Sequence, residues 1–189
     1  MWLDQIRDIV ESDLEINWKH FSLEEINNIE GAGQEIWKLA DRTIARSLLA
    51  QMALEAASLQ GREAMDRYFL AMLIARHGGQ GRIPLNKTEP LLALAKDVGL
   101  DSERIRRDMY KPSVVEAIER DHRDAVMKYG VFGTPTFIFD GDSAVYLKTF
   151  TPPESDSLTF FEQFVAISAN NPHLGELKRP QPPWPRGFI

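Results

Sequence analysis

Hydrophobic and polar positions along the chain follow a helical period in most places and a period of two in a few. Apolar side chains predict a helix at the start of the chain, because they recur on one helical face at Trp2, Leu3, Ile6, Ile9 and Val10. The stretch LEINW, residues 14–18, instead alternates apolar and polar side chains. This alternation predicts a strand with one buried face.

The middle of the chain carries the signals of consecutive helices. The sequence SLEE at Ser22 to Glu25 is a capping box, which predicts the start of a short helix. Residues 34–60 keep a helical spacing without proline and predict one long helix. Further helices are predicted over residues 62–77, 88–99, 101–111 and 113–129, with Thr88 and Asp101 as N-caps and Gly99 as a stop.

The pattern returns to strand after Gly130. The stretches TFIFD and AVYLKT, separated by a turn at Gly141-Asp142, predict a hairpin that is followed by a helix over residues 155–169. Five of the 11 prolines lie in residues 171–189, so we expect no regular structure there and interpret Trp184 and Phe188 as covering apolar surface.

Pro135 stands directly before the strand TFIFD, where a proline does not interrupt the hydrogen-bond ladder. Two conformations are compatible with this position: a cis Thr134-Pro135 bond, or a trans proline that begins an edge strand. We expect the cis form. It would leave the backbone amide and carbonyl of Thr134 facing outward, where they could bind an extended substrate segment.

Composition and charge exclude several classes of protein. The 189 residues suffice for one full-sized domain with one elaboration, and the net charge of −6 argues against nucleic acid as a partner. No apolar run approaches the roughly 20 residues of a membrane span, and we expect a cytoplasmic protein. The absence of cysteine excludes thiolate chemistry by this chain, and the four histidines show no metal-ligand spacing.

The stretch VFGTPTFIFD resembles the cis-proline segment of the DsbA family of thioredoxin-fold proteins. The stretches LEINWKHFSLEEIN and NNPHLGELKRPQPP resemble its cytoplasmic FrnE-like branch, near the mycothiol-dependent nitroreductases. The resemblance implies an α/β, thioredoxin-like fold with an all-helical insertion between core strands. It divides the chain into a partial thioredoxin-like half (1–30), the insertion (31–112), the cis-proline strand with hairpin and last helix (113–170), and the proline-rich tail (171–189).

One departure from the family's pattern limits what the resemblance implies. Members of the family begin with a strand that ends in Cys-Pro-x-Cys or a serine variant, and that motif opens the helix that here begins at Met1-Trp2. This strand is normally central, between LEINW and TFIFD. We therefore expect that the natural gene continues upstream; otherwise LEINW pairs directly with TFIFD, or a second chain supplies the strand.

Three functions follow as hypotheses. The first is a DsbA-family thiol-disulfide oxidoreductase-like protein that lacks its catalytic cysteines and binds a thiol or disulfide substrate at Gly133, Thr134 and Pro135. The second is an enzyme similar to kappa-class glutathione transferases and hydroxychromene-carboxylate isomerases. Its low-molecular-weight thiol, mycothiol or glutathione, would be held at Ser155, Asp156 and Ser157, although plain N-caps explain these residues more simply.

The third hypothesis is a non-catalytic binding module. Four methionines at helical spacing could line an adaptable groove, although core packing explains them more simply: Met52, Met65, Met72 and Met109. We predict no metal and no catalytic residue in this chain, and consider a homodimer as a candidate assembly.

Overall fold

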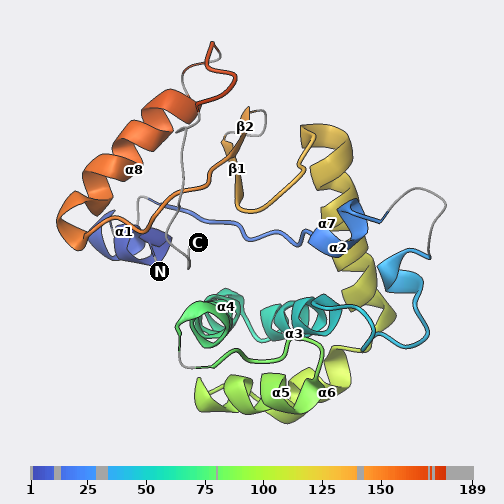
Figure 1. Cartoon of the computed structure of the whole chain (residues 1–189). Helices are drawn as coiled ribbons and strands as arrows, with labels where there is room; N and C mark the ends of the chain where they lie inside the picture. The colour runs from blue at the N-terminus through green and yellow to red at the C-terminus, as the bar shows by residue number, and fades with distance from the viewer. Residues whose placement is uncertain are drawn as a thin grey trace. The chain divides into compact units, whose positions relative to one another are not determined.

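The computed structural model describes residues 2–10, 14–28, 34–79, 81–139, 143–169, 171 and 173–177. The described part is mainly helical, with a small antiparallel sheet (Figure 1). Its elements are α1 (Trp2–Val10), α2 (Leu23–Ile26), the 3-10 helix η2 (Ile36–Lys38), α3 (Leu48–Ser58), α4 (Arg62–His77), α5 (Thr88–Asp97), α6 (Ser102–Asp108), α7 (Pro112–Tyr129), β1 (Thr136–Phe139), β2 (Ser143–Tyr146) and α8 (Glu154–Ser168).

The chain forms two compact units. The helical unit comprises Lys19–Val126, and the sheet unit comprises Met1–Trp18 together with Met127–Ile189. This division places residues 19–28 and 113–126 with the helical block, whereas the sequence assigned them to the thioredoxin-like parts. The sheet unit is thus built from the two ends of the chain.

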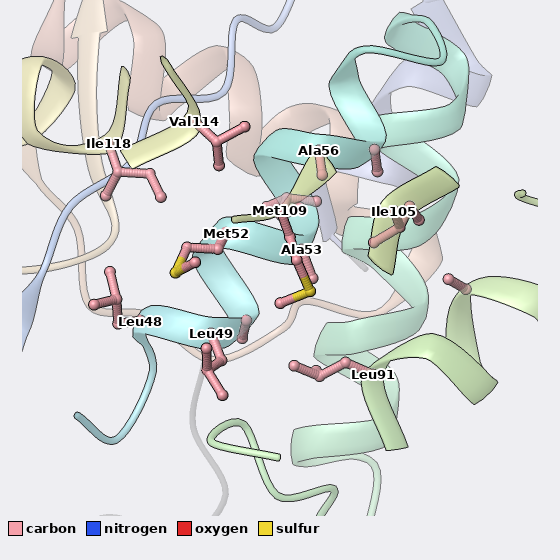
Figure 2. Close-up of a cluster of buried hydrophobic side chains, with 14 of the residues drawn as sticks. Leu48, Leu49, Met52, Ala53, Ala56, Leu91, Ile105, Met109, Val114 and Ile118 are labelled. Atoms are coloured by element: carbon pink, nitrogen blue, oxygen red, sulfur yellow. The ribbon is translucent and has the colours of Figure 1, made fainter. Parts of the chain in front are cut away.

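The helical unit has a large hydrophobic core to which η2 and the helices α3 to α7 contribute (Figure 2). Met52 and Met109 lie fully buried in this core, Met72 is also buried, and Met65 packs against it. These side chains fill the interior, which confirms core packing as their role and contradicts the alternative of a methionine groove. The Tyr68 hydroxyl is buried there as well and donates a 2.8 Å hydrogen bond to the Leu91 carbonyl.

The sheet unit packs one face of a hairpin against α1 and α8, which lie beside each other (Figure 1). β1 and β2 pair antiparallel, with Thr136 opposite Tyr146 and Phe139 opposite Ser143. Phe137, Phe139 and Val145 contact the small core of Trp2, Ile6 and Phe164. Because side chains alternate along a strand, Ile138 and Tyr146 lie on the opposite face, where both are exposed.

Most predicted elements are confirmed, among them the first helix, the helices over 62–77 and 113–129, the hairpin and the last helix. The Asp101 cap is confirmed too, since its carboxylate accepts a 2.8 Å hydrogen bond from the Arg104 N–H. Gly99 follows α5 with a φ of +80°, a conformation that favours glycine. Thr88 is not a cap, because it is the first helical residue of α5, and Lys87 holds the cap position.

The predicted strand LEINW is wrong. Among the described residues, the sheet contains β1 and β2, and residues 14–18 are not assigned to it. The alternation itself persists, with Leu14, Ile16 and Trp18 half-buried and the intervening side chains exposed. A period-two pattern reports an extended segment with one buried face, whereas a strand also needs a partner for its ladder. Direct pairing of LEINW with TFIFD is thereby contradicted.

The predicted long helix over residues 34–60 is also wrong, because only η2 and α3 are helical there. Side chains bind the backbone amides that a continuous helix would use. Asp41 accepts hydrogen bonds from the amide and hydroxyl of Thr43, and Glu24 accepts one from the Arg46 amide. Glu25 accepts a 2.9 Å bond from the Ile36 amide, so only the Ser22 half of the capping box is formed.

Some predictions lie outside the described residues: the turn at Gly141-Asp142 and the roles of Trp184 and Phe188 in the tail. In the part of the chain that the structure describes, no helix is both long and apolar enough to cross a membrane.

Candidate functional site

The candidate site is the loop that leads from α7 into β1. Gly130 ends α7 with a φ of +62°, and the Thr134–Pro135 peptide bond is cis. Along the loop, Gly133 is buried and Thr134 is exposed. Phe132, which precedes them, is 68% exposed.

Contacts within the sheet unit fix the loop. The Thr136 hydroxyl donates a 2.7 Å hydrogen bond to the Gly133 carbonyl, and the Leu147 amide donates a 3.2 Å bond to the Pro135 carbonyl. The Tyr146 ring lies 5.1 Å from the Phe132 ring, centroid to centroid. A Cβ atom on Gly133 would lie only 3.2 Å from Cε2 of Tyr146, so glycine is what allows this ring to lie close to the loop.

Thr134 differs from its neighbours in its backbone hydrogen bonding. The carbonyls of Gly133 and Pro135 are occupied, whereas the N–H and C=O of Thr134 have no hydrogen-bond partner among the described residues. Because Thr134 is also exposed, its N–H and C=O are candidates for binding another molecule. An adjacent donor and acceptor on one residue is what an extended peptide backbone pairs with.

The structure places the other predicted site residues elsewhere. Ser155, Asp156 and Ser157 lie in the first turn of α8, next to α1 and away from the loop that leads into β1 (Figure 1). The Ser157 side chain is fully buried and its hydroxyl contacts Gln5 Oε1 and the Pro153 carbonyl, both at 3.1 Å. The Ser155 hydroxyl donates to the Asp156 carboxylate. The two predicted groups of residues are therefore not brought together.

Sequence analysis missed Phe132 and Tyr146 as part of the site. Phe132 was visible in the motif VFGTP, but its contact with Tyr146 depends on the register of the hairpin. That register places Tyr146 opposite Thr136, directly after the cis-proline. A two-residue turn at 141–142, as the sequence predicts, would instead place Leu147 opposite Thr136, so the predicted hairpin did not indicate this pairing.

A buried polar cluster in the helical unit joins residues 20–22 to α7 and α3. The Ser22 amide donates a 3.2 Å hydrogen bond to His122 Nδ1, and His20 Nε2 lies 3.0 Å from the Glu55 carboxylate. The His122 ring packs between the rings of Phe21 and Trp37. Burial, with a smaller contribution from the Arg123 charge, lowers the pKa of His122. These contacts hold elements together inside the unit.

The sequence contains no cysteine, and no group of three or more potential metal ligands occurs among the described residues. The described part of the helical unit also has a surface hollow of about 510 Å³ at the end of α4, where Arg82 is the one charged lining residue. The loop at Thr134 is therefore the better candidate for a functional surface.

Comparison with known proteins identifies the family. The model of the DSBA-like thioredoxin domain matches residues 2–166, which is most of the chain. This chain belongs to the DSBA-like thioredoxin domain family. The predicted family is thus confirmed, and with it the α/β thioredoxin-like fold with a helical insertion.

Three curated proteins are similar to this member of the DSBA-like family. Rv2286c of Mycobacterium tuberculosis is 28% identical over 185 residues, covering 97% of this chain and 76% of the relative. The ClpXP adapter protein SpxH of Bacillus licheniformis is 34% identical over 101 residues, covering 53% of this chain and 33% of the relative. The Na(+)/H(+) antiporter NhaA of Herminiimonas arsenicoxydans is 43% identical over 53 residues, covering 28% of this chain and 8% of the relative.

Proposed function

We propose that the loop at Gly133, Thr134 and Pro135 binds a thiol- or disulfide-containing substrate of a DsbA-type thiol-disulfide oxidoreductase-like protein. The family supports the reaction class, since DSBA-like thioredoxin domains belong to such oxidoreductases. The nucleophile is not among the residues of this sequence, which holds no cysteine. The contribution of this chain is thus recognition of the substrate.

The observation that carries the proposal is the pair of unused polar groups on Thr134. An exposed residue whose N–H and C=O are both unused can form both hydrogen bonds of an antiparallel bridge with a residue of an extended ligand. The loop is held in place by the bonds at Gly133 and Pro135. Binding therefore needs little additional ordering of the protein.

A titration followed by NMR tests this proposal. Oxidised glutathione and a short peptide with a disulfide loop are added to ¹⁵N-labelled protein, and the Thr134 amide resonance is expected to shift at millimolar ligand or below. A series of peptides carries a single backbone N-methyl group, placed on a different residue in each. Methylation of the residue that pairs with Thr134 should weaken binding about tenfold, because it removes a hydrogen bond of the bridge. An unchanged Thr134 resonance at millimolar ligand would refute the proposal.

The kappa-class alternative remains a proposal with a different ligand. A low-molecular-weight thiol such as glutathione or mycothiol would occupy the same edge and place its carboxylate at Ser155, Asp156 and Ser157. Ser155 and Asp156 are exposed, but the Ser157 hydroxyl is already bonded inside the unit. This alternative predicts resonance shifts at both Thr134 and Ser155 when reduced glutathione is added.

A second candidate function is a non-catalytic binding module. It is favoured by the absence of cysteine and by the similarity to a protein named as a ClpXP adapter. The two functions differ in whether the sulfur atoms of the ligand matter. If replacing both peptide cysteines by serine leaves the affinity unchanged, the binding module is supported. A loss of binding supports the oxidoreductase-like function.

The candidate homodimer is tested separately, by measuring the mass of the protein in solution by sedimentation of the same samples.

A further inference from the structure

The surface hollow at the end of α4 is built by a segment, residues 81–83, that folds back on the helix. The Ile83 amide donates a 3.1 Å hydrogen bond to the Ala75 carbonyl, and Arg76 Nη1 donates a 3.0 Å bond to the Ile83 carbonyl. The Ile83 side chain packs against the core of the helical unit. Both walls of the hollow, α4 and this returning segment, are therefore held in place.

The hollow combines apolar walls with one cation that has no partner. Its volume is about 510 Å³, and it is lined by Ile74, Ala75, Gly78, Gly81, Arg82 and Ile83. Arg82 is exposed, and its guanidinium forms no hydrogen bond or ion pair among the described residues. Ile74 is 52% exposed. The hollow thus offers a positive charge beside apolar surface that is open to solvent.

Positive charge accumulates around the hollow in an acidic protein. Residues 67–88 contain four Lys or Arg side chains and His77 but no Asp or Glu, although the net charge of the chain is −6. Desolvation, and then the charges of Arg76 and Arg82, lower the pKa of His77. Both guanidinium groups therefore lie close enough to the imidazole to disfavour its charged form.

The acidic side chains of the helices that pack against α4 do not balance this charge. α4 packs against α3 and α5. Glu55 of α3 contacts His20, and Glu89 of α5 binds Arg106 through both carboxylate oxygens. Asp97 lies in the last turn of α5, whereas the returning segment leads into the first turn.

The helix dipole of α4 explains part of this arrangement. Cations are favourable in the last turn of a helix, which accounts for Arg76 and His77. Arg82 belongs to the returning segment, and the carbonyls of Ile74 and Ala75 already accept backbone hydrogen bonds. The charge of Arg82 is therefore left for another partner.

We propose that the hollow binds a small organic anion, with a carboxylate or phosphate group on Arg82 and an apolar body against Ile74 and Ile83. Guanidinium groups bind such oxyanions through paired hydrogen bonds, and the apolar area removed from water adds affinity. The volume of the hollow is in the range of small-molecule sites. This site lies within the helical unit, so the inference is independent of the proposed function.

Three matched probes test the charge and the apolar body separately. Phenylacetate carries both, acetate carries the charge, and phenylethanol carries the apolar body. Each probe is titrated into the ¹⁵N-labelled full chain, and the Ile83 amide resonance is followed. Phenylacetate is expected to bind about tenfold more tightly than either other probe. A parallel titration with phenyl phosphate identifies which oxyanion the site prefers.

Three variants assign the binding to the hollow. Arg82→Gln should weaken phenylacetate binding about tenfold, because a charged hydrogen bond is lost. Arg107→Gln, the matched control, removes an exposed arginine of α6 and should leave the affinity unchanged. Ile74→Ser should reduce the preference for phenylacetate over acetate to about threefold or less. An unchanged urea midpoint of unfolding in each variant shows that the fold is kept.

His77 gives a second readout that does not depend on an affinity. A bound anion opposes the arginine charges that lower the pKa of His77, so this pKa should rise when phenylacetate is added. It is measured from the imidazole resonances, with the exposed His173 as the control. A pKa of His77 that stays the same at saturating phenylacetate would contradict the inference.

Other outcomes also overturn the inference. It fails if Arg82→Gln binds phenylacetate as tightly as the natural chain, or if Arg107→Gln weakens binding equally. Equal affinities for phenylacetate and phenylethanol would show that the anionic group contributes nothing. If a hexaglutamate peptide shifts the Ile83 amide at lower concentrations than phenylacetate does, the hollow binds acidic protein segments instead of a small ligand. None of these results affects the proposed function, which concerns Thr134.

Discussion

His122 accepts a hydrogen bond from the Ser22 amide through Nδ1, so this nitrogen carries no proton in the folded protein. Burial, reinforced by Arg123, lowers the pKa of the imidazole. In the unfolded chain a histidine titrates near pH 6.5. On acidification the unfolded state therefore takes up this proton first, and stability falls as the pH drops below about 6.5 towards the lowered pKa.

Replacing His122 by Asn should remove this part of the acid sensitivity. The Asn oxygen can still accept from Ser22, but it does not titrate, so the slope of unfolding free energy against pH between 7 and 5 should become shallower. One proton accounts for at most about 1.4 kcal/mol per pH unit. Urea titrations at several pH values measure the slope, with the exposed His173→Asn as the control. A slope equal to that of the natural chain would contradict the role assigned to His122.

Tyr68 has the opposite pH dependence. Its side chain is fully buried, and burial raises the pKa of the phenol above the usual value near 10. The unfolded chain therefore loses this proton first, and stability declines as the pH rises above about 10.

The variant Tyr68→Phe should lower the unfolding free energy at pH 7 by about 0.5–1.5 kcal/mol, because the bond to the Leu91 carbonyl is lost. It should also make the decline above pH 10 less steep. Tyr110→Phe is the matched control, since its exposed hydroxyl bonds the Thr88 hydroxyl and its loss should change stability by less than about 0.5 kcal/mol. Equal alkaline slopes for all three proteins would show that Tyr68 is not the titrating group.

At the scale of elements, the sequence predicted the features that depend on residues close together in the chain. The helix over 62–77 and the cap at Asp101 need only neighbours in the sequence, and both were predicted. The start of η2 and the segment before α3 depend on Glu25 and Glu24, which reach them from another helix. Residues 14–18 kept their alternation but are not assigned to the sheet, because alternation indicates one buried face and not which segment lies alongside.

In the candidate site, too, some residues are evident from the local sequence and others depend on contacts between residues distant in the chain. Gly133, Thr134 and Pro135 form a contiguous motif, and the sequence indicated them directly. Tyr146 joins them only through the hairpin register, and Ser157 is removed from the candidates only by its contact with α1. Sequence spacing carries no information about either contact.

The contact between α1 and α8 gives a prediction about Ser157. Its hydroxyl bonds Gln5 Oε1 of α1 and the Pro153 carbonyl, and the Trp2 indole N–H lies 3.4 Å from its carbonyl oxygen. Ser157→Ala should therefore lower the unfolding free energy by about 0.5–1.5 kcal/mol. The affinity for glutathione, measured by calorimetry, should not change.

Ser155→Ala is the matched control for this prediction. The Ser155 hydroxyl is exposed and bonds only the neighbouring Asp156 carboxylate among the contacts of the described residues, so its removal should cost less than about 0.5 kcal/mol. Weaker glutathione binding in Ser157→Ala, with unchanged stability, would instead support the kappa-class alternative.

At the scale of the whole molecule, the two units have cores of very different size. Among the described residues, the core of the helical unit contains 23 buried side chains, whereas that of the sheet unit contains Trp2, Ile6 and Phe164. Stability grows with the apolar surface that a unit buries. The sheet unit, which carries the candidate site, should therefore open at a lower free energy than the helical unit.

Limited proteolysis of the full chain should reveal this order. Cleavage is expected first in the two segments of the sheet unit, residues 1–18 and 127–189, leaving a resistant fragment close to Lys19–Val126 that mass spectrometry can identify. Phe164→Ala should speed the first cleavage without shortening the lifetime of the fragment, because Phe164 contacts Trp2, Phe137 and Phe139 in the sheet unit. Leu91→Ala, in the other core, should shorten the fragment's lifetime and cost about 2–5 kcal/mol. If Phe164→Ala speeds cleavage inside residues 19–126 of the intact chain as strongly as Leu91→Ala does, the two units unfold together and the cooperative unit is the whole chain.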